Sequence, residues 1–118
     1  MSEGLRALER AVTAWNESDR NQYLELYADD VVLHSGSMGE SHGVREVKAK
    51  YRMVWSAYDS RLEVDELFSE GNSVACRYRW IATEKVSGKA FSVQGMTILH
   101  FAGEKCVERW DLEFKAES

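Results

Sequence analysis

One stretch near the end of the chain, residues 89–114, constrains the fold more than any other. Two runs rich in β-branched, aromatic and aliphatic residues, 90–101 and 106–114, flank the short link Ala102-Gly103-Glu104-Lys105. Such a pair of runs around a glycine-containing link predicts a long β-hairpin. Because side chains alternate across a strand, Gln94, Met96 and Ile98 share one face of the first strand. In the second strand the apolar side belongs to Trp110, and Asp111 has the opposite parity.

The N-terminal half of the chain predicts three helices. The first ends near Asn16, the second has Ser18 or Asp19 as its N-cap, and the third begins around Val44. Apolar residues at intervals of three and four give each helix one apolar face. These residues are Leu5, Leu8, Val12 and Trp15 in the first helix, Tyr23, Leu26 and Tyr27 in the second, and Val44, Val47, Tyr51, Val54, Trp55 and Tyr58 in the third.

The remaining segments predict strands and one long loop. Residues 31–34 form a short strand, and residues 35–43 contain three glycines, which exclude regular structure and suit a lid over a pocket. Four strands follow, at 61–68, 74–83, 90–101 and 106–114. Helices followed by a strand meander predict an α+β fold, with helices on one face of a mostly antiparallel sheet. At 118 residues, we expect residues 1–118 to form a single domain.

Composition and charge exclude several classes of protein. A formal net charge of −5 with scattered Lys and Arg argues against a nucleic-acid partner. No apolar run approaches the ~20 residues needed to cross a bilayer, and the opening Ser-Glu-Gly is unlike a targeting segment, so we expect no membrane association and a cytoplasmic location.

Cys76 and Cys106 are interpreted as apolar free thiols rather than a disulfide. The His and Cys spacings predict no metal site, no phosphate-binding glycine motif is present, and we expect no cofactor.

Several segments together resemble the SnoaL-like polyketide cyclases of the NTF2-like superfamily, to which ketosteroid isomerases and limonene epoxide hydrolases also belong. The resemblance lies in residues 27–34, 61–68, 92–101 and 103–111. It implies a cone in which a curved sheet and the helices enclose a cavity. It also implies a homodimer formed through the outer sheet face, because that face would otherwise expose apolar side chains. By strand parity we expect this outer face to carry Val93, Leu99, Phe101, Trp110 and Leu112.

The resemblance also points to catalytic residues. Asp111 matches the general acid/base of the cyclases, and we expect it to face the cavity beside Gln94, Met96 and Ile98, where apolar walls would raise its pKa. The alternative is that Asp111 pairs with Arg109 or another cation and has no chemical role. His34 ends a strand that contributes a polar side chain to the pocket in these families, and it could hydrogen-bond Asp111. Alternatively, His34 is a partly buried residue bonded to a backbone carbonyl.

Comparison within the superfamily narrows the chemistry. Gln94 matches a pocket glutamine of the cyclases and offers an amide donor, but Met96 stands where they have a histidine. Limonene epoxide hydrolases use an Arg-x-Asp pair on a strand, and the stretch Arg77-Tyr78-Arg79 lacks the acid. No Tyr and Asp pair of the ketosteroid isomerase kind can be placed.

Aromatic residues on the helix faces suit a cavity for a flat hydrophobic ligand, although most of them belong to the core. The candidates for ligand contact are Trp15, Tyr27, Tyr51, Trp55 and Tyr58. Two hypotheses follow. The protein is a cofactor-independent cyclase or isomerase that acts on a hydrophobic carbonyl compound through Asp111, with help from His34 and Gln94. Alternatively, it is a noncatalytic dimeric module that binds a small hydrophobic molecule.

Overall fold

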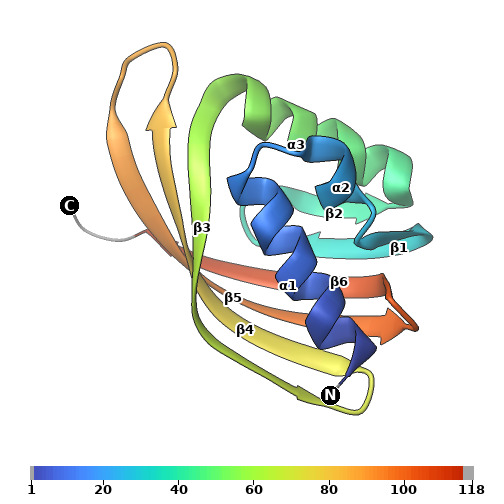
Figure 1. The fold of residues 1–118 in the computed structure, drawn as a ribbon. Helices are drawn as coiled ribbons and strands as arrows, with labels where there is room; N and C mark the ends of the chain where they lie inside the picture. The colour runs from blue at the N-terminus through green and yellow to red at the C-terminus, as the bar shows by residue number, and fades with distance from the viewer. Residues whose placement is uncertain (1, 116–118) are drawn as a thin grey trace.

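The computed structural model describes residues 2–115, which form three helices and six strands (Figure 1). The helices are α1 (Glu3–Asn16), α2 (Arg20–Leu24) and α3 (Val44–Ala57). The strands are β1 (Tyr27–Ser35), β2 (Gly39–His42), β3 (Tyr58–Glu70), β4 (Ser73–Glu84), β5 (Ala90–Ala102) and β6 (Lys105–Lys115).

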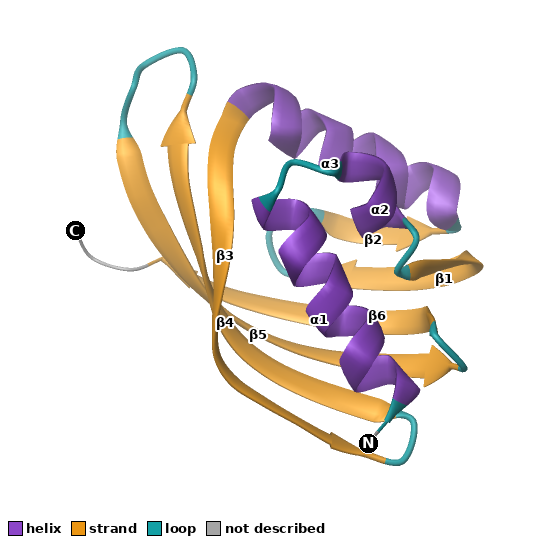
Figure 2. Cartoon of the chain, in the orientation of Figure 1, coloured by secondary structure: helices purple, strands orange, loops and turns teal. Residues whose placement is uncertain are grey.

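The strands form one curved, unclosed sheet with the order β2-β1-β6-β5-β4-β3. Neighbouring strands are antiparallel except β1 and β6, which are parallel. All three helices lie on the concave side of the sheet (Figures 1 and 2). This arrangement confirms the predicted α+β fold, with helices covering one face of a mostly antiparallel sheet.

Local sequence explains where the helices begin. The hydroxyl of Ser2 accepts a hydrogen bond from the amide of Leu5 at 2.9 Å, and Asp19 Oδ1 accepts one from the amide of Gln22 at 3.2 Å. These bonds satisfy amide groups that have no partner within the helix. Before α3, Gly43 takes a φ of +86°, a conformation that L side chains rarely adopt. The chain can therefore turn sharply from β2 into α3.

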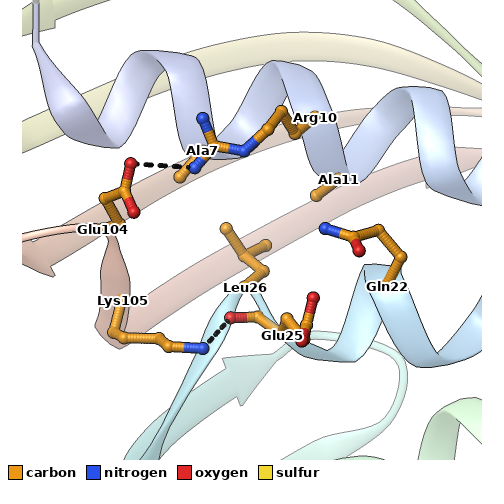
Figure 3. Close-up of a pocket in the computed structure, with 8 residues that line it drawn as sticks. All are labelled: Ala7, Arg10, Ala11, Gln22, Glu25, Leu26, Glu104 and Lys105. Carbon is orange, nitrogen blue, oxygen red and sulfur yellow. Dashed lines mark hydrogen bonds and ion pairs between the residues drawn. The ribbon is translucent and has the colours of Figure 1, made fainter.

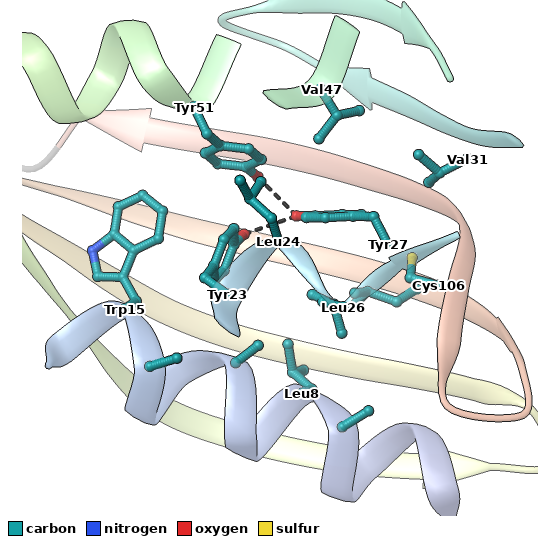
Figure 4. Packing of buried hydrophobic residues seen from close by; sticks show 14 of the residues in the cluster. Leu8, Trp15, Tyr23, Leu24, Leu26, Tyr27, Val31, Val47, Tyr51 and Cys106 are labelled. Carbon is teal, nitrogen blue, oxygen red and sulfur yellow. Dashed lines mark hydrogen bonds between the residues drawn. The ribbon is translucent and has the colours of Figure 1, made fainter. Parts of the chain in front are cut away.

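The hydrophobic core lies between α1, α3 and the concave face of the sheet. Side chains from β1, α3, β5 and β6 pack there without solvent contact, among them Val31, Leu33, Val47, Leu99 and Cys106. Figure 4 shows part of this packing, with α1 contributing Leu8 and Trp15. Cys76 and Cys106 are buried free thiols, as expected from the sequence, and burial raises their pKa to about 11 and about 12.

Three local predictions are wrong. Residues 39–42 form β2, which pairs with β1 in register, so the glycine-rich segment is a short hairpin rather than a loop throughout. The second helix ends at Leu24, so Leu26 lies in the following turn and Tyr27 begins β1, and the third helix ends at Ala57, so Tyr58 begins β3. In each case pairing with a neighbouring strand overrides the local pattern, as β propensity depends on tertiary context.

A β-bulge in the C-terminal hairpin reverses the predicted faces of β5 relative to β6. His100 pairs with Glu108, but the next residue, Phe101, pairs with Cys106, so Val107 is an extra residue in β6. A one-residue shift moves every side chain to the opposite face. Asp111 therefore pairs with Thr97, not with Met96.

Because of this bulge, two sets of predictions about which face a side chain occupies are wrong. Gln94, Met96 and Ile98 lie on the outer face and are exposed, away from Asp111. Leu99 and Phe101 belong to the core instead of the outer face, and Val93 lines the internal cavity. Trp110 and Leu112 are on the outer face as predicted, where they join Met96, Ile98 and Phe114.

None of the helices within residues 2–115 combines the length and apolar character needed to cross a lipid bilayer.

Candidate functional site

A cavity of about 310 Å³ lies between the helices and the concave face of the sheet. The helices contribute Trp15, Tyr23, Tyr51 and Val54, and the turn between β1 and β2 contributes Ser37 and Met38. The sheet contributes apolar and aromatic side chains from β3, β4 and β5, namely Tyr58, Leu62, Tyr78, Trp80, Phe91 and Val93. Its charged lining comes from alternate positions of β6: Arg109, Asp111 and Glu113.

Three of the five predicted aromatic residues line this cavity. They are Trp15, Tyr51 and Tyr58. Tyr27 is a buried core residue whose hydroxyl bonds to Tyr51, and Trp55 borders a separate small hollow near the start of α2. The apolar spacing identified these aromatic residues as facing inward, although Tyr27 and Tyr58 belong to strands, and only side-chain packing separates a cavity wall from a core residue.

Asp111 lines the cavity as a buried carboxylate in an ion pair with Arg109. Nε of Arg109 lies 3.0 Å from Asp111 Oδ2, and Nη2 donates to Oδ1 at 3.2 Å. Burial alone would lower the pKa of Arg109, but the Asp111 carboxylate and the neighbouring tyrosines raise it well above its usual range. Arg109 is therefore always charged. A pairing of Asp111 with Arg109 is the predicted alternative to catalysis, and the structure places this pair in the buried interior.

Tyrosine and threonine hydroxyls hold the rest of the Arg109 guanidinium. Nη1 donates to the hydroxyl of Tyr27 at 2.9 Å, and Nε donates to Thr97 Oγ1 at 3.1 Å. The Tyr27 hydroxyl is also 2.8 Å from that of Tyr23 and 3.0 Å from that of Tyr51 (Figure 4). Burial raises the pKa of Tyr27 and of Tyr51 well above the usual range, so both remain protonated. This network fixes the position of Arg109, and through it that of Asp111.

Tyr78 is a second donor to the carboxylate. Its hydroxyl donates to Asp111 Oδ1 at 3.3 Å, and burial, followed by the charge of Asp111, raises its pKa so that it stays neutral. Gly95 makes this position possible. A Cβ at Gly95 would lie 2.3 Å from Cζ of Tyr78 and 2.6 Å from its hydroxyl oxygen. Any side chain there would displace the Tyr78 ring.

His34 is placed away from Asp111, contrary to the predicted contact. In the parallel pairing of β1 with β6, His34 lies beside Trp110 and Ser35 lies beside Asp111. The imidazole therefore stacks on Trp110 at the outer face, with ring centroids 5.3 Å apart. Its Nε2 lies 2.8 Å from Glu108 and its Nδ1 lies 3.0 Å from Glu40. Hydrogen bonding to Glu108, with a further contribution from Glu40, raises the pKa of His34.

Gln94, Met96 and Ile98 make no contribution to the cavity lining, because their side chains leave the opposite face of β5. Conversely, sequence reasoning missed Arg109, Tyr78 and Glu113 as cavity residues. The alternation Arg109-x-Asp111-x-Glu113 could have identified Arg109 and Glu113, because alternate residues of a strand share one face of the sheet with Asp111. The Arg-x-Asp pattern sought at residues 77–79 is thus present at 109–111.

A second hollow, of about 330 Å³, lies between α1, α2 and the β5–β6 turn (Figure 3). Its charged groups are engaged by other parts of the chain. Arg10 pairs with Glu104 at 3.1 Å, and Lys105 donates to the backbone carbonyl of Glu25. Within residues 2–115, no group of three or more His, Cys, Asp or Glu side chains is placed to hold a metal ion. The first cavity is therefore the candidate functional site.

Sequence comparison agrees with this fold. The sequence model of the SnoaL-like domain matches residues 8–109. The chain belongs to the SnoaL-like domain family. The matched segment ends two residues before Asp111. It therefore includes most of the helices and of the sheet but not Asp111 and Glu113, the two carboxylates that line the cavity. No curated protein sequence matches the chain.

Solved structures with the same fold have differing functions. An NTF2-like protein of unknown function from Burkholderia pseudomallei superposes with a TM-score of 0.86 and 23% identity, covering 98% of this chain and 92% of that chain. A proposed polyketide cyclase from Pseudomonas putida superposes with a TM-score of 0.83 and 14% identity, covering 95% of this chain and 91% of that chain. An epoxide hydrolase of the limonene epoxide hydrolase type from Mycobacterium tuberculosis superposes with a TM-score of 0.82 and 14% identity, covering 94% of this chain and 82% of that chain. At these identities the likeness shows that the SnoaL-like chain shares their fold.

Proposed function

We propose that this SnoaL-like protein binds a flat, hydrophobic carbonyl compound in the cavity and isomerises or cyclises it by proton transfer through Asp111, without a cofactor. The observation that carries this proposal is the position of Asp111, a buried carboxylate at the wall of an aromatic cavity. Apolar walls of this kind suit a hydrophobic ligand, and convergent polar groups orient it.

In this scheme Asp111 takes a proton from the carbon next to the substrate carbonyl and returns it to another atom of the same molecule. Arg109 orients the carboxylate, because its guanidinium is always charged and held by hydroxyl groups. The neutral Tyr78 donates its hydroxyl proton to Asp111 Oδ1 and so helps to hold the carboxylate in position.

A second candidate function is noncatalytic ligand binding, and the Arg109 ion pair favours it. Oδ1 of Asp111 already accepts hydrogen bonds from Arg109 Nη2 and from Tyr78, and Oδ2 lies 3.0 Å from Arg109 Nε in the ion pair. A carboxylate whose oxygens already have these partners is less accessible to a proton on a ligand. The site would then recognise a ligand by shape and hydrogen bonding alone.

Proton exchange separates the two functions. 2-Tetralone, a flat hydrophobic ketone, would be incubated with the protein in D₂O, and deuterium uptake beside the carbonyl followed by NMR. Catalysis predicts uptake above the buffer rate and a decrease of about 10²- to 10⁴-fold in Asp111→Asn. Asp29→Asn, at an exposed residue of β1, is the matched control. Binding of tetralone without any excess uptake would support the noncatalytic alternative.

We also propose that the protein is a homodimer formed through the outer face of β5 and β6. Met96, Ile98, Leu112 and Phe114 are between 46% and 54% exposed there, next to the partly exposed Trp110. A contiguous apolar patch of this kind is uncommon on a monomer. A two-fold axis through the patch would bring the same side chains of both copies together.

A further inference from the structure

We propose that the ligand of this cavity carries a positive charge, as a tertiary or quaternary ammonium group on an aromatic carbonyl skeleton. This inference rests on the proposed function, because it specifies the substrate class of the same site. It follows from the charge balance of the cavity and from the arrangement of its aromatic rings.

One guanidinium and two carboxylates line the cavity, so its charged lining has a net charge of one negative. Arg109 and Asp111 neutralise each other at 3.0 Å. Glu113 is the remaining charge. Its Oε1 accepts a hydrogen bond from Ser37 at 2.8 Å, and no cationic side chain of residues 2–114 forms an ion pair with it. An anionic ligand would meet two carboxylates here, whereas a cation would supply the missing counter-charge.

The rings that border the cavity favour the same ligand. Tyr58, Trp80 and Phe91 pack edge to face, with centroid separations of 5.1–5.6 Å and interplanar angles of 74–79°. This arrangement forms an aromatic corner instead of a flat stack. Ring faces attract ammonium groups through their quadrupole, most strongly where water is excluded. A neutral alkyl group of the same shape would gain the contact area but not this attraction.

Strand geometry separates the two ends of the ligand. Asp111 and Glu113 are alternate residues of β6, so their positions are about 7 Å apart along the strand. A carbonyl near Asp111 and an ammonium near Glu113 would therefore lie at opposite ends of one aromatic ring. The turn residue Ser37, which bonds Glu113, would sit beside the charged end.

Three probes with one skeleton test the inference. They are 4-acetyl-N,N,N-trimethylanilinium, its neutral isostere 4-tert-butylacetophenone, and the anion 4-acetylbenzoate. Affinities would be measured by calorimetry for the wild type, for Glu113→Gln and for Glu70→Gln. Glu70 is an exposed carboxylate of β3 that does not line the cavity, so it controls for the change in net charge.

We expect the cation to bind about tenfold more tightly than its neutral isostere, and the anion to bind most weakly. Glu113→Gln should remove most of that preference while leaving the affinity for the neutral probe within about twofold, which also shows that the variant is folded. Glu70→Gln should behave as the wild type. Equal affinity for the cation and the neutral isostere, or a preference that survives Glu113→Gln, would overturn the inference. The deuterium-exchange test of the proposed function uses 2-tetralone, which is uncharged. Its outcome therefore does not depend on whether the cavity prefers a cation.

Discussion

Nε of Arg109 lies 3.0 Å from Oδ2 of Asp111, and the two side chains are 9% and 4% exposed. Removing charges from water is costly, and the cost is recovered only if each charge is paired and hydrogen-bonded. Here the remaining donors of Arg109 meet Thr97 and Tyr27. The pair is thus a stable unit in which neither member can be removed alone without leaving a buried charge.

Replacing Arg109 with Met should lower the free energy of unfolding by about 3–5 kcal/mol, because Asp111 would be left buried without its counter-charge. Urea denaturation followed by circular dichroism measures this change. The double variant Arg109→Met/Asp111→Leu should lose less than the single one. Arg61→Met, which removes an exposed partner of Glu63, is the control and should cost less than about 1 kcal/mol. Equal losses for Arg109→Met and Arg61→Met would contradict the role of the buried pair.

Gly95→Ala should destabilise the protein by about 1–3 kcal/mol, because the added methyl group would overlap the Tyr78 ring. Thermal unfolding measures the loss. Gly36→Ala is the matched control, since a Cβ there meets nothing closer than 3.7 Å. Combining Gly95→Ala with Tyr78→Leu should recover part of the loss. If the Tyr78 change gave no recovery, the overlap with its ring would not be the cause.

His34 should titrate above its usual pKa of about 6.5, because Glu108 and Glu40 stabilise the imidazolium. This pairing contributes stability that is fully present below the unfolded pKa and is lost as pH rises through the folded pKa. NMR titration of the imidazole checks the direction. Glu108→Gln should lower the pKa of His34, whereas Asp111→Asn should leave it unchanged. A shift in the pKa of His34 in Asp111→Asn would contradict the placement of the two side chains on opposite faces of the sheet.

Leu112→Glu should convert the proposed dimer to a monomer, because it places two like charges at the apolar patch where the copies meet. Analytical ultracentrifugation measures the mass in solution. Val86→Glu is the control, since Val86 is 96% exposed in the β4–β5 turn away from that patch. A wild type that sediments as a monomer over a wide concentration range would contradict the proposal.

The fold was largely predictable from the residues themselves. Apolar spacing in residues 5–15 and 44–55 identified α1 and α3, and alternating runs identified β3 to β6, because these patterns are periodic over several turns or residue pairs. The short β2 was missed, as its four residues carry no periodic signal and form a strand through pairing with β1. The burial of Asp111 among aromatic walls was also predicted.

The residue pattern alone specifies most of the helices and strands and the side chains within each strand that share a face. How those faces combine depends on the packing of the whole chain. The extra residue at Val107 turned Asp111 toward Thr97 and sent Gln94 and Met96 to the outer surface. The parallel pairing of β1 with β6 likewise set His34 beside Trp110. Alternation within one strand is a local property, whereas register between strands depends on bulges and on which arrangement buries the most apolar surface.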